Sequence, residues 1–187
     1  MAIDPATLSV EEYRALRATI RQRGNLRFVS VIASFAVWAG LAVLIQTQTT
    51  APTAVLISLL VLAAGFEITY ALHVGTERVG RYLQVYYESV TGVTPSWEHL
   101  AMAIGQDKTA APLKVDALFS AMFALAAVLN LLPVALQGAS TADGWPIELI
   151  AYSAFHALFI VRIVQARRIA RHQRAQDLAF FEKQRHA

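Results

Sequence analysis

The chain has 187 residues, of which 56% are hydrophobic and 16% are charged, and its formal net charge is +3. Its mean hydropathy of +0.46 excludes an ordinary water-soluble domain, because a soluble core of this size needs more polar surface than the chain supplies. The absence of cysteine excludes disulfides, thiolate catalysis, cysteine-bound iron–sulfur clusters and lipid anchors attached to cysteine.

The N-terminal segment, residues 1–27, is predicted to form an amphipathic helix over residues 9–23. Two acidic residues in its first turn, Glu11 and Glu12, suit the positive end of the helix dipole, and Gly24 can end the helix. Apolar side chains share one face of this helix, while three arginines share another. Such a helix either lies on a membrane surface or packs against another part of the same protein, and both interpretations stay open.

Two apolar stretches, residues 28–46 and 53–72, predict a first transmembrane hairpin. Each has about the 20 residues needed to cross the hydrocarbon core of a bilayer. The short uncharged connection between them predicts a tight turn. Ser30 and Ser34 are small and four residues apart, a spacing that lets membrane helices approach each other closely.

The connection that follows, residues 73–115, predicts a helical insertion rather than a simple link. Charged and apolar residues recur at helical spacing on different sides of its first half. A second helix is expected to start at Pro95, which suits a first helical position, and to end near Gly105. Residues 73–105 are called the helical platform below.

Two further apolar stretches, residues 116–137 and 146–166, predict a second transmembrane hairpin. Pro133 is expected to kink the third span, and the basic tail, residues 167–187, is expected to extend the fourth span as a helix. The sequence therefore predicts an all-α integral membrane protein with a four-helix transmembrane bundle.

The distribution of basic residues predicts the orientation of this bundle. All sixteen Lys and Arg residues lie outside the connections at 47–52 and 138–145, whereas five lie before the first span, four between spans two and three, and seven from Arg162 onward. By the positive-inside rule, both termini and the platform face the cytoplasm. The thirteen Arg against three Lys suggest a bacterial source, and hence an inner membrane. The basic clusters predict contact with anionic lipids, so nucleic-acid binding is not expected.

Four polar residues inside the predicted spans are candidate functional residues: Glu67, Asn130, His156 and Arg162. Counted at ~1.5 Å per residue, Glu67 and Arg162 lie at similar depths, so they can meet if spans two and four are neighbours. The pair is interpreted either as a structural ion pair or as part of a proton or ion relay. His156 is expected to form a hydrogen bond with Tyr152 or Asn130; haem is not expected, since no second histidine matches its depth.

The platform also carries a candidate metal site, because carboxylates and imidazoles occur together there: His73, Glu77, Glu98 and His99. His73 and Glu77 are four residues apart and share a helix face. However, no established metal-binding motif is present, and Glu77 has an ion-pair partner at Arg81. The pattern favours a salt-bridged, solvated face over a ligand set, and no cofactor is predicted.

Aromatic side chains gather on the platform and make it a candidate docking surface: Tyr82, Tyr86, Tyr87 and Trp97. Such residues also suit the headgroup level of a membrane. No motif for catalysis or nucleotide binding is found in the sequence. The leading hypothesis is a non-enzymatic subunit or scaffold that presents the platform to a protein partner or to a second copy. The alternatives are a transporter or channel component that uses Glu67, His156 and Arg162, and a membrane enzyme or metal-binding protein.

Overall fold

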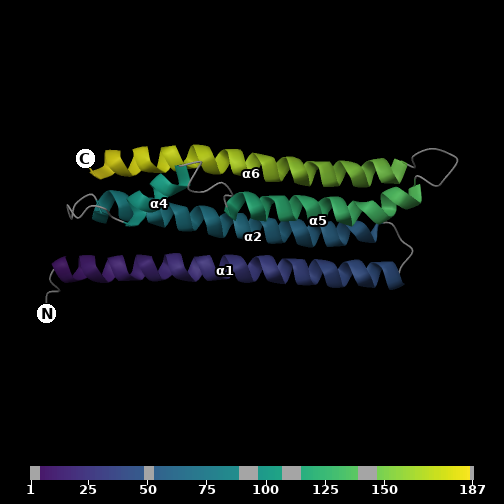
Figure 1. Cartoon of the computed structure of the whole chain (residues 1–187), viewed down its shortest axis with the longest axis horizontal. Coiled ribbons are helices and arrows are strands. Elements are labelled where there is room, and N and C mark those ends of the chain that lie inside the picture. The colour runs from purple at the N-terminus through teal and green to yellow at the C-terminus, as the bar shows by residue number, and fades with distance from the viewer. Residues whose placement is uncertain (1–4, 49–52, 89–96, 107–114, 139–146, 186–187) are drawn as a thin grey trace. The chain divides into compact units, whose positions relative to one another are not determined.

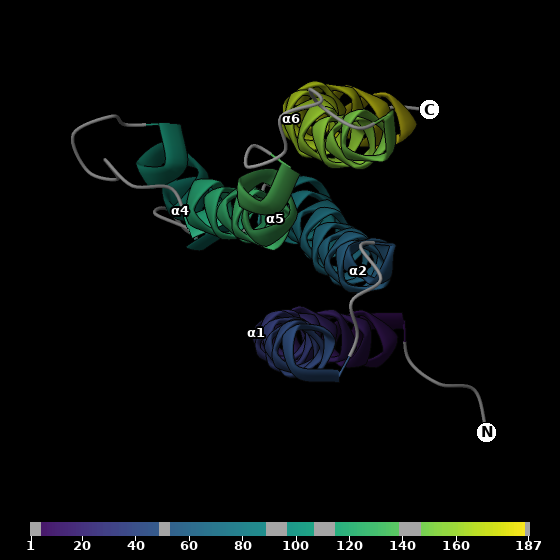
Figure 2. The ribbon, with the colours of Figure 1, turned by 90° about the vertical axis from the view of Figure 1, so that its right-hand side faces the viewer.

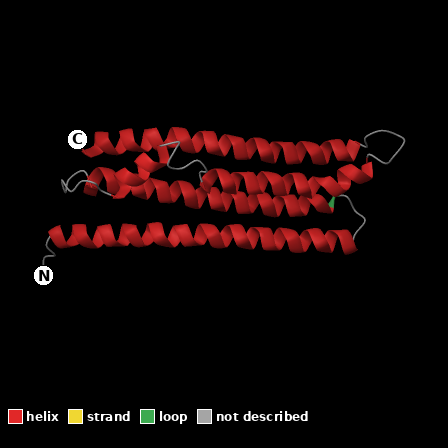
Figure 3. Cartoon of the chain, in the orientation of Figure 1, coloured by secondary structure: helices red, strands yellow, loops and turns green. Residues whose placement is uncertain are grey.

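The computed structural model describes residues 5–48, 53–88, 97–106, 115–138 and 147–185, and these residues are helical throughout apart from the turn residue Thr53 (Figures 1 and 3). The helices are α1 Pro5–Gln48, α2 Ala54–Leu83, the π-helix η1 Gln84–Glu88, α4 Trp97–Gln106, α5 Val115–Gly138 and α6 Ile147–Arg185. Most of the two predicted turns, and much of the predicted insertion, lie outside the described residues.

Among the described residues, four helices are long and apolar enough to cross a membrane, and they cover nearly all of the four predicted spans. The qualifying stretches are Ser9–Ile45, Ala54–Glu88, Ala117–Leu136 and Ile147–Arg185. The described part of the chain is therefore all-helical and has the composition of an integral membrane protein. Pro133 lies inside α5, and α6 continues to Arg185, so the basic tail does extend the fourth span.

The predicted helix end at Gly24 is wrong, because α1 runs through this residue without a break. A glycine inside a helix costs about 1 kcal/mol relative to alanine, which a long helix can absorb when no proline follows. A Cβ atom added at Gly24 would meet nothing within 4 Å, so no close contact requires a glycine there. The apolar stretch and the helix thus have different boundaries at this end.

The chain divides into two compact units. Unit 1 consists of Met1–Arg27, Ala71–Lys114 and Arg168–Ala187, and unit 2 of Phe28–Tyr70 and Val115–Arg167. In unit 2, segments of α1, α2, α5 and α6 run alongside one another as a bundle (Figures 1 and 2).

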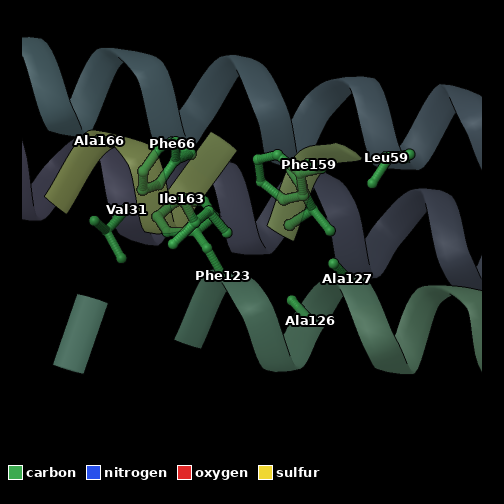
Figure 4. Packing of buried hydrophobic residues seen from close by; sticks show 10 residues of the cluster. Val31, Leu59, Phe66, Phe123, Ala126, Ala127, Phe159, Ile163 and Ala166 are labelled. Carbon is green, nitrogen blue, oxygen red and sulfur yellow. The ribbon is translucent and has the colours of Figure 1, made fainter. Parts of the chain in front are cut away.

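The core of unit 2 is drawn from all four of its helices (Figure 4). Its buried members are Val31, Leu59, Leu62, Phe66, Phe123, Ala126, Ala127, Phe159, Ile163 and Ala166. Phe123 is fully buried, and its ring centroid lies 5.1 Å from that of Phe35 and 5.6 Å from that of Phe66. Close packing of this kind helps to hold helices together in a membrane. The hydrophobic effect contributes little there, because apolar side chains gain little free energy when they move from lipid into a protein interior.

Unit 2 has an apolar exterior and several polar side chains in its interior. Large apolar residues on its surface, such as Ile32, Leu60 and Leu158, are 63–69% exposed. Buried polar residues include Ser58, Thr69, Ser120, Asn130 and His156. A water-soluble bundle shows the opposite distribution, so this arrangement suits a hydrocarbon surrounding.

Helices α1 and α2 approach closely through small residues. A Cβ atom added at Gly65 would clash with the Ser34 side chain, and the Ser30 and Thr69 hydroxyls lie 3.5 Å apart. The predicted spacing of Ser30 and Ser34 is therefore part of a helix contact, against Gly65 and Thr69 at the same spacing on α2.

Candidate functional site

Glu67 and Arg162 form a two-pronged ion pair in unit 2. The Arg162 Nε atom lies 2.7 Å from Glu67 Oε1, and Nη2 donates to Oε2 at 2.8 Å. The guanidinium carbon lies 5.4 Å from the centroid of the Tyr70 ring, within cation–π range. The side chains of Arg162 and Glu67 remain 35% and 46% exposed, so the pair lies at the surface of the bundle rather than in its core.

Asn130 lies at the centre of a second polar group, which connects the four helices of unit 2. Its Oδ1 atom accepts from Trp38 Nε1 of α1 at 3.1 Å and from the Ser58 hydroxyl of α2 at 2.6 Å. Its Nδ2 atom donates to the Val55 carbonyl of α2 at 3.0 Å and lies 3.1 Å from His156 Nε2 of α6. Each buried polar atom of the Asn130 amide therefore has partners, as burial requires.

The hydrogen positions of this network follow from the chemistry of its ends. Trp38 Nε1 can only donate, so the Asn130 atom facing it must be the oxygen. His156 Nδ1 lies 2.7 Å from the Tyr152 carbonyl, which can only accept, so Nδ1 carries the hydrogen. His156 Nε2 then accepts from Asn130, and the imidazole is neutral. A second ring proton would face an amide N–H, so this geometry does not suit proton transfer through His156.

The four intramembrane candidates thus separate into two pairs, Glu67 with Arg162 and Asn130 with His156. No hydrogen bond or ion pair joins the two pairs within the described residues. Sequence reasoning missed Trp38 and Ser58 as members of the Asn130 network. A serine and a tryptophan inside apolar stretches were the available signal, because both are polar groups that need partners in a membrane.

In unit 1, Glu77 is surrounded by basic side chains. It lies 2.8 Å from Arg81, 3.1 Å from Arg174 of α6 and 3.7 Å from the His73 ring. Arg81, which is 3% exposed, also pairs with Asp177 of α6 at 2.9 Å. Burial alone would raise the pKa of the Glu77 carboxyl, but His73, Arg174 and Arg81 together hold this pKa below its ordinary value. The group ties α2 to α6 with charges that are compensated locally.

The four candidate metal ligands do not form one set. His73 and Glu77 lie together in the α2–α6 ion-pair group, whereas Glu98 pairs with Arg17 and His99 with Glu88. Within the residues that the structure describes, no group of three or more His, Asp or Glu side chains is placed to hold a metal ion.

Glu88 is the residue of the platform that sequence reasoning missed. Its carboxylate accepts from the backbone N–H of Glu98 at 2.9 Å and from that of His99 at 3.3 Å, so it caps the N-terminus of α4. Its side chain is 7% exposed and lies 3.4 Å from Arg17 of α1. Arg17 also donates to Glu98, so α1 and η1 both hold the first turn of α4.

The three platform tyrosines are partly buried and make aromatic contacts within unit 1. Tyr82 and Tyr86 contact each other, and both contact Phe181 of α6. Tyr87 contacts Tyr82, and it also contacts Tyr13 of α1. Burial and a hydrogen bond to a carboxylate raise the pKa of Tyr87 to about 12. The Tyr87 phenol therefore stays protonated near neutral pH, and the three tyrosine rings take part in the internal packing of unit 1.

Helix α4 differs from the tyrosine cluster because its apolar residues are exposed. Trp97, Leu100 and Ile104 are 67%, 42% and 51% exposed, and their spacing places them on one face over two helical turns. Glu98, on another side of the helix, is half-buried and joined to Arg17. Of the four predicted docking aromatics, Trp97 is thus the exposed one.

Comparison of the chain with models of known protein families, with characterised proteins and with solved structures gives no match.

Proposed function

We propose that the chain is a non-enzymatic subunit or scaffold of a bacterial inner membrane, with both termini and the helical platform in the cytoplasm. The orientation rests on the sixteen Lys and Arg residues, none of which lies in the two connections assigned to the opposite side. Contact of the basic segments with anionic headgroups stabilises this orientation.

The observation that carries the proposal is the exposed apolar face of α4. Trp97, Leu100 and Ile104 form a stripe of the length that a helix-in-groove contact uses, and tryptophan is among the residues that contribute most to protein interfaces. Glu88 and Arg17 hold the first turn of α4 in place before a partner arrives, so little ordering entropy is lost on binding. The occupant is an apolar helix or groove of a protein partner.

The arrangement of charge also favours binding over catalysis. The carboxylates that a platform enzyme would use, such as Glu77 and Glu98, are engaged by arginines. Transport through the bundle has less support, since the His156 network is neutral and saturated and Glu67 is paired with Arg162 by two contacts.

The test is purification of the full chain in mild detergent, followed by mass spectrometry of the proteins that accompany it. The double variant Trp97→Ala/Leu100→Ala should lose a protein that the wild type retains. Val10→Ala, which truncates an exposed apolar residue of α1, is the matched control and should keep that protein. Identical partners for all three chains, or no partner for the wild type, would refute the proposal.

A further inference from the structure

The Glu67–Arg162 pair is a charged feature on the largely apolar surface of unit 2. Around it, most of the exposed side chains of α2 and α6 are apolar, among them Ile68, Leu158, Val161 and Val164, while Gln165 and Arg167 lie toward the basic tail. The pair has no net charge, yet 46% of the Glu67 side chain and 35% of the Arg162 side chain are exposed. Charged groups exposed to hydrocarbon are costly, so something polar is expected to meet them in the membrane.

Both partners of the pair have hydrogen-bonding capacity left over. A guanidinium has five N–H groups, and Glu67 engages Nε and Nη2. The Nη1 group has no acceptor among the described residues. A carboxylate can accept about four hydrogen bonds, and within the same residues Arg162 supplies two of them. The Tyr70 ring, 5.4 Å from the guanidinium carbon, restricts where this group can move.

The position of the pair along its helices puts it within reach of lipid headgroups. Glu67 is five residues from Leu72, the end of its apolar stretch, and Arg162 is four residues from Ala166, the end of its own stretch. At ~1.5 Å per residue, these distances are about 7.5 Å and about 6 Å. A long arginine side chain reaches across such a distance toward the interface.

We propose that Glu67 and Arg162 together bind the headgroup of a zwitterionic phospholipid that carries a primary ammonium. The phosphate of the lipid accepts hydrogen bonds from the remaining N–H groups of Arg162, a pairing that arginine geometry favours. The ammonium of the same headgroup donates to the exposed part of the Glu67 carboxylate.

Charge decides which lipid class fits this site. An anionic headgroup would meet a carboxylate at no net gain, because Glu67 already neutralises Arg162. A headgroup with one positive and one negative group matches both partners and leaves the complex neutral. A trimethylated ammonium cannot donate an N–H hydrogen bond, so it should satisfy the carboxylate less well.

The test measures which lipids the full chain retains. The protein is equilibrated in mixed micelles that contain equal amounts of phosphatidylethanolamine, phosphatidylcholine and phosphatidylglycerol, and retained lipid is counted by native mass spectrometry. The wild type should retain phosphatidylethanolamine at least about tenfold over each of the other two, the effect of one charge-assisted hydrogen bond. Equal retention of all three lipids would overturn the proposal.

Single substitutions test which side chain determines the lipid preference. Glu67→Gln should abolish the preference over phosphatidylcholine, and Arg162→Gln should lower retention of every phospholipid. Arg167→Gln removes a nearby exposed arginine of the same helix and should leave the preference intact. Equal binding of phosphatidylglycerol and phosphatidylethanolamine would refute the ammonium contact. A dimer that Glu67→Gln dissociates, without lipid preference, would assign the pair to a second copy instead. The lipid comparison on wild type remains decisive if a variant does not fold.

Discussion

The Asn130 network gives the sharpest test of how unit 2 is held together. Replacing Asn130 with alanine removes hydrogen bonds to Trp38, Ser58, the Val55 carbonyl and His156, all of which cross between helices. Hydrogen bonds between membrane helices contribute about 0.6 kcal/mol each on average, so Asn130→Ala should lower the free energy of unfolding by about 2 kcal/mol. The buried Trp38 N–H and the small cavity left behind act in the same direction.

The assay is reversible unfolding in mixed micelles titrated with a denaturing detergent, followed by far-UV circular dichroism. Leu129→Ala is the matched control, because Leu129 neighbours Asn130 on α5 but is 46% exposed, and it should change stability far less. A double-mutant cycle between Asn130→Ala and Trp38→Phe should give a coupling energy of about 0.5–1 kcal/mol. A loss below about 0.5 kcal/mol for Asn130→Ala, or one equal to that of Leu129→Ala, would show that this network does not hold the four helices of unit 2 together.

Three further predictions use the same unfolding assay or hydrogen exchange. Gly24→Ala should stabilise the protein by about 0.5–1 kcal/mol, because the added methyl group meets no other atom within 4 Å. Gly65→Ala should destabilise it by about 1–3 kcal/mol, because the added methyl group clashes with Ser34 of α1. Equal effects of the two substitutions would contradict the fold. The lowered pKa of Glu77 means that its carboxylate adds stability above the ordinary carboxyl pKa of about 4.3, and that this contribution is lost as pH falls through the folded pKa. The stability difference between wild type and Glu77→Gln should therefore shrink between pH 5 and pH 3 or below, and a pH-independent difference would exclude the mechanism. Glu88→Ala should accelerate amide exchange in the first turn of α4 about fivefold, as loss of about 1 kcal/mol of capping implies, while Glu11→Ala, a change in an exposed pair, should not.

The four apolar helices could be predicted from the sequence because hydrocarbon imposes a length and a composition on each span. Hydropathy does not predict where the helices themselves end. Gly24 lies before the first span with no proline after it, so α1 continues through the change in polarity. A helix ends where backbone conformation and capping residues stop it. A membrane span ends where the surroundings of the chain change from hydrocarbon to water.

The contacts of the candidate residues were predictable to different degrees. Counting residues along two spans predicted similar depths for Glu67 and Arg162, because both lie on helices of known rise, but the fold was needed to show that spans two and four are neighbours there. The cap of α4 by Glu88 was not predictable, because residues 89–96 separate the two in the sequence and no sequence pattern links Glu88 to the start of α4. The role of the tyrosines depended on Phe181, a residue about a hundred positions away that only the fold places beside them.

Polar side chains pair with ions in unit 1 and with neutral groups in the core of unit 2. This difference limits which residues are candidates for a functional role. In unit 1 the partners are ions, such as Arg81 between Glu77 and Asp177, an arrangement suited to a region that water can reach. In unit 2 the central partners are neutral, because an uncompensated charge among Trp38, Asn130 and His156 would be costly in a low-dielectric surrounding. Both sets are internally compensated and therefore suit structural roles. Within the described residues, the apolar face of α4 and the half-exposed Glu67–Arg162 pair are two features whose surroundings leave something unmatched. The proposed protein partner belongs to the first of these features and the proposed lipid headgroup to the second.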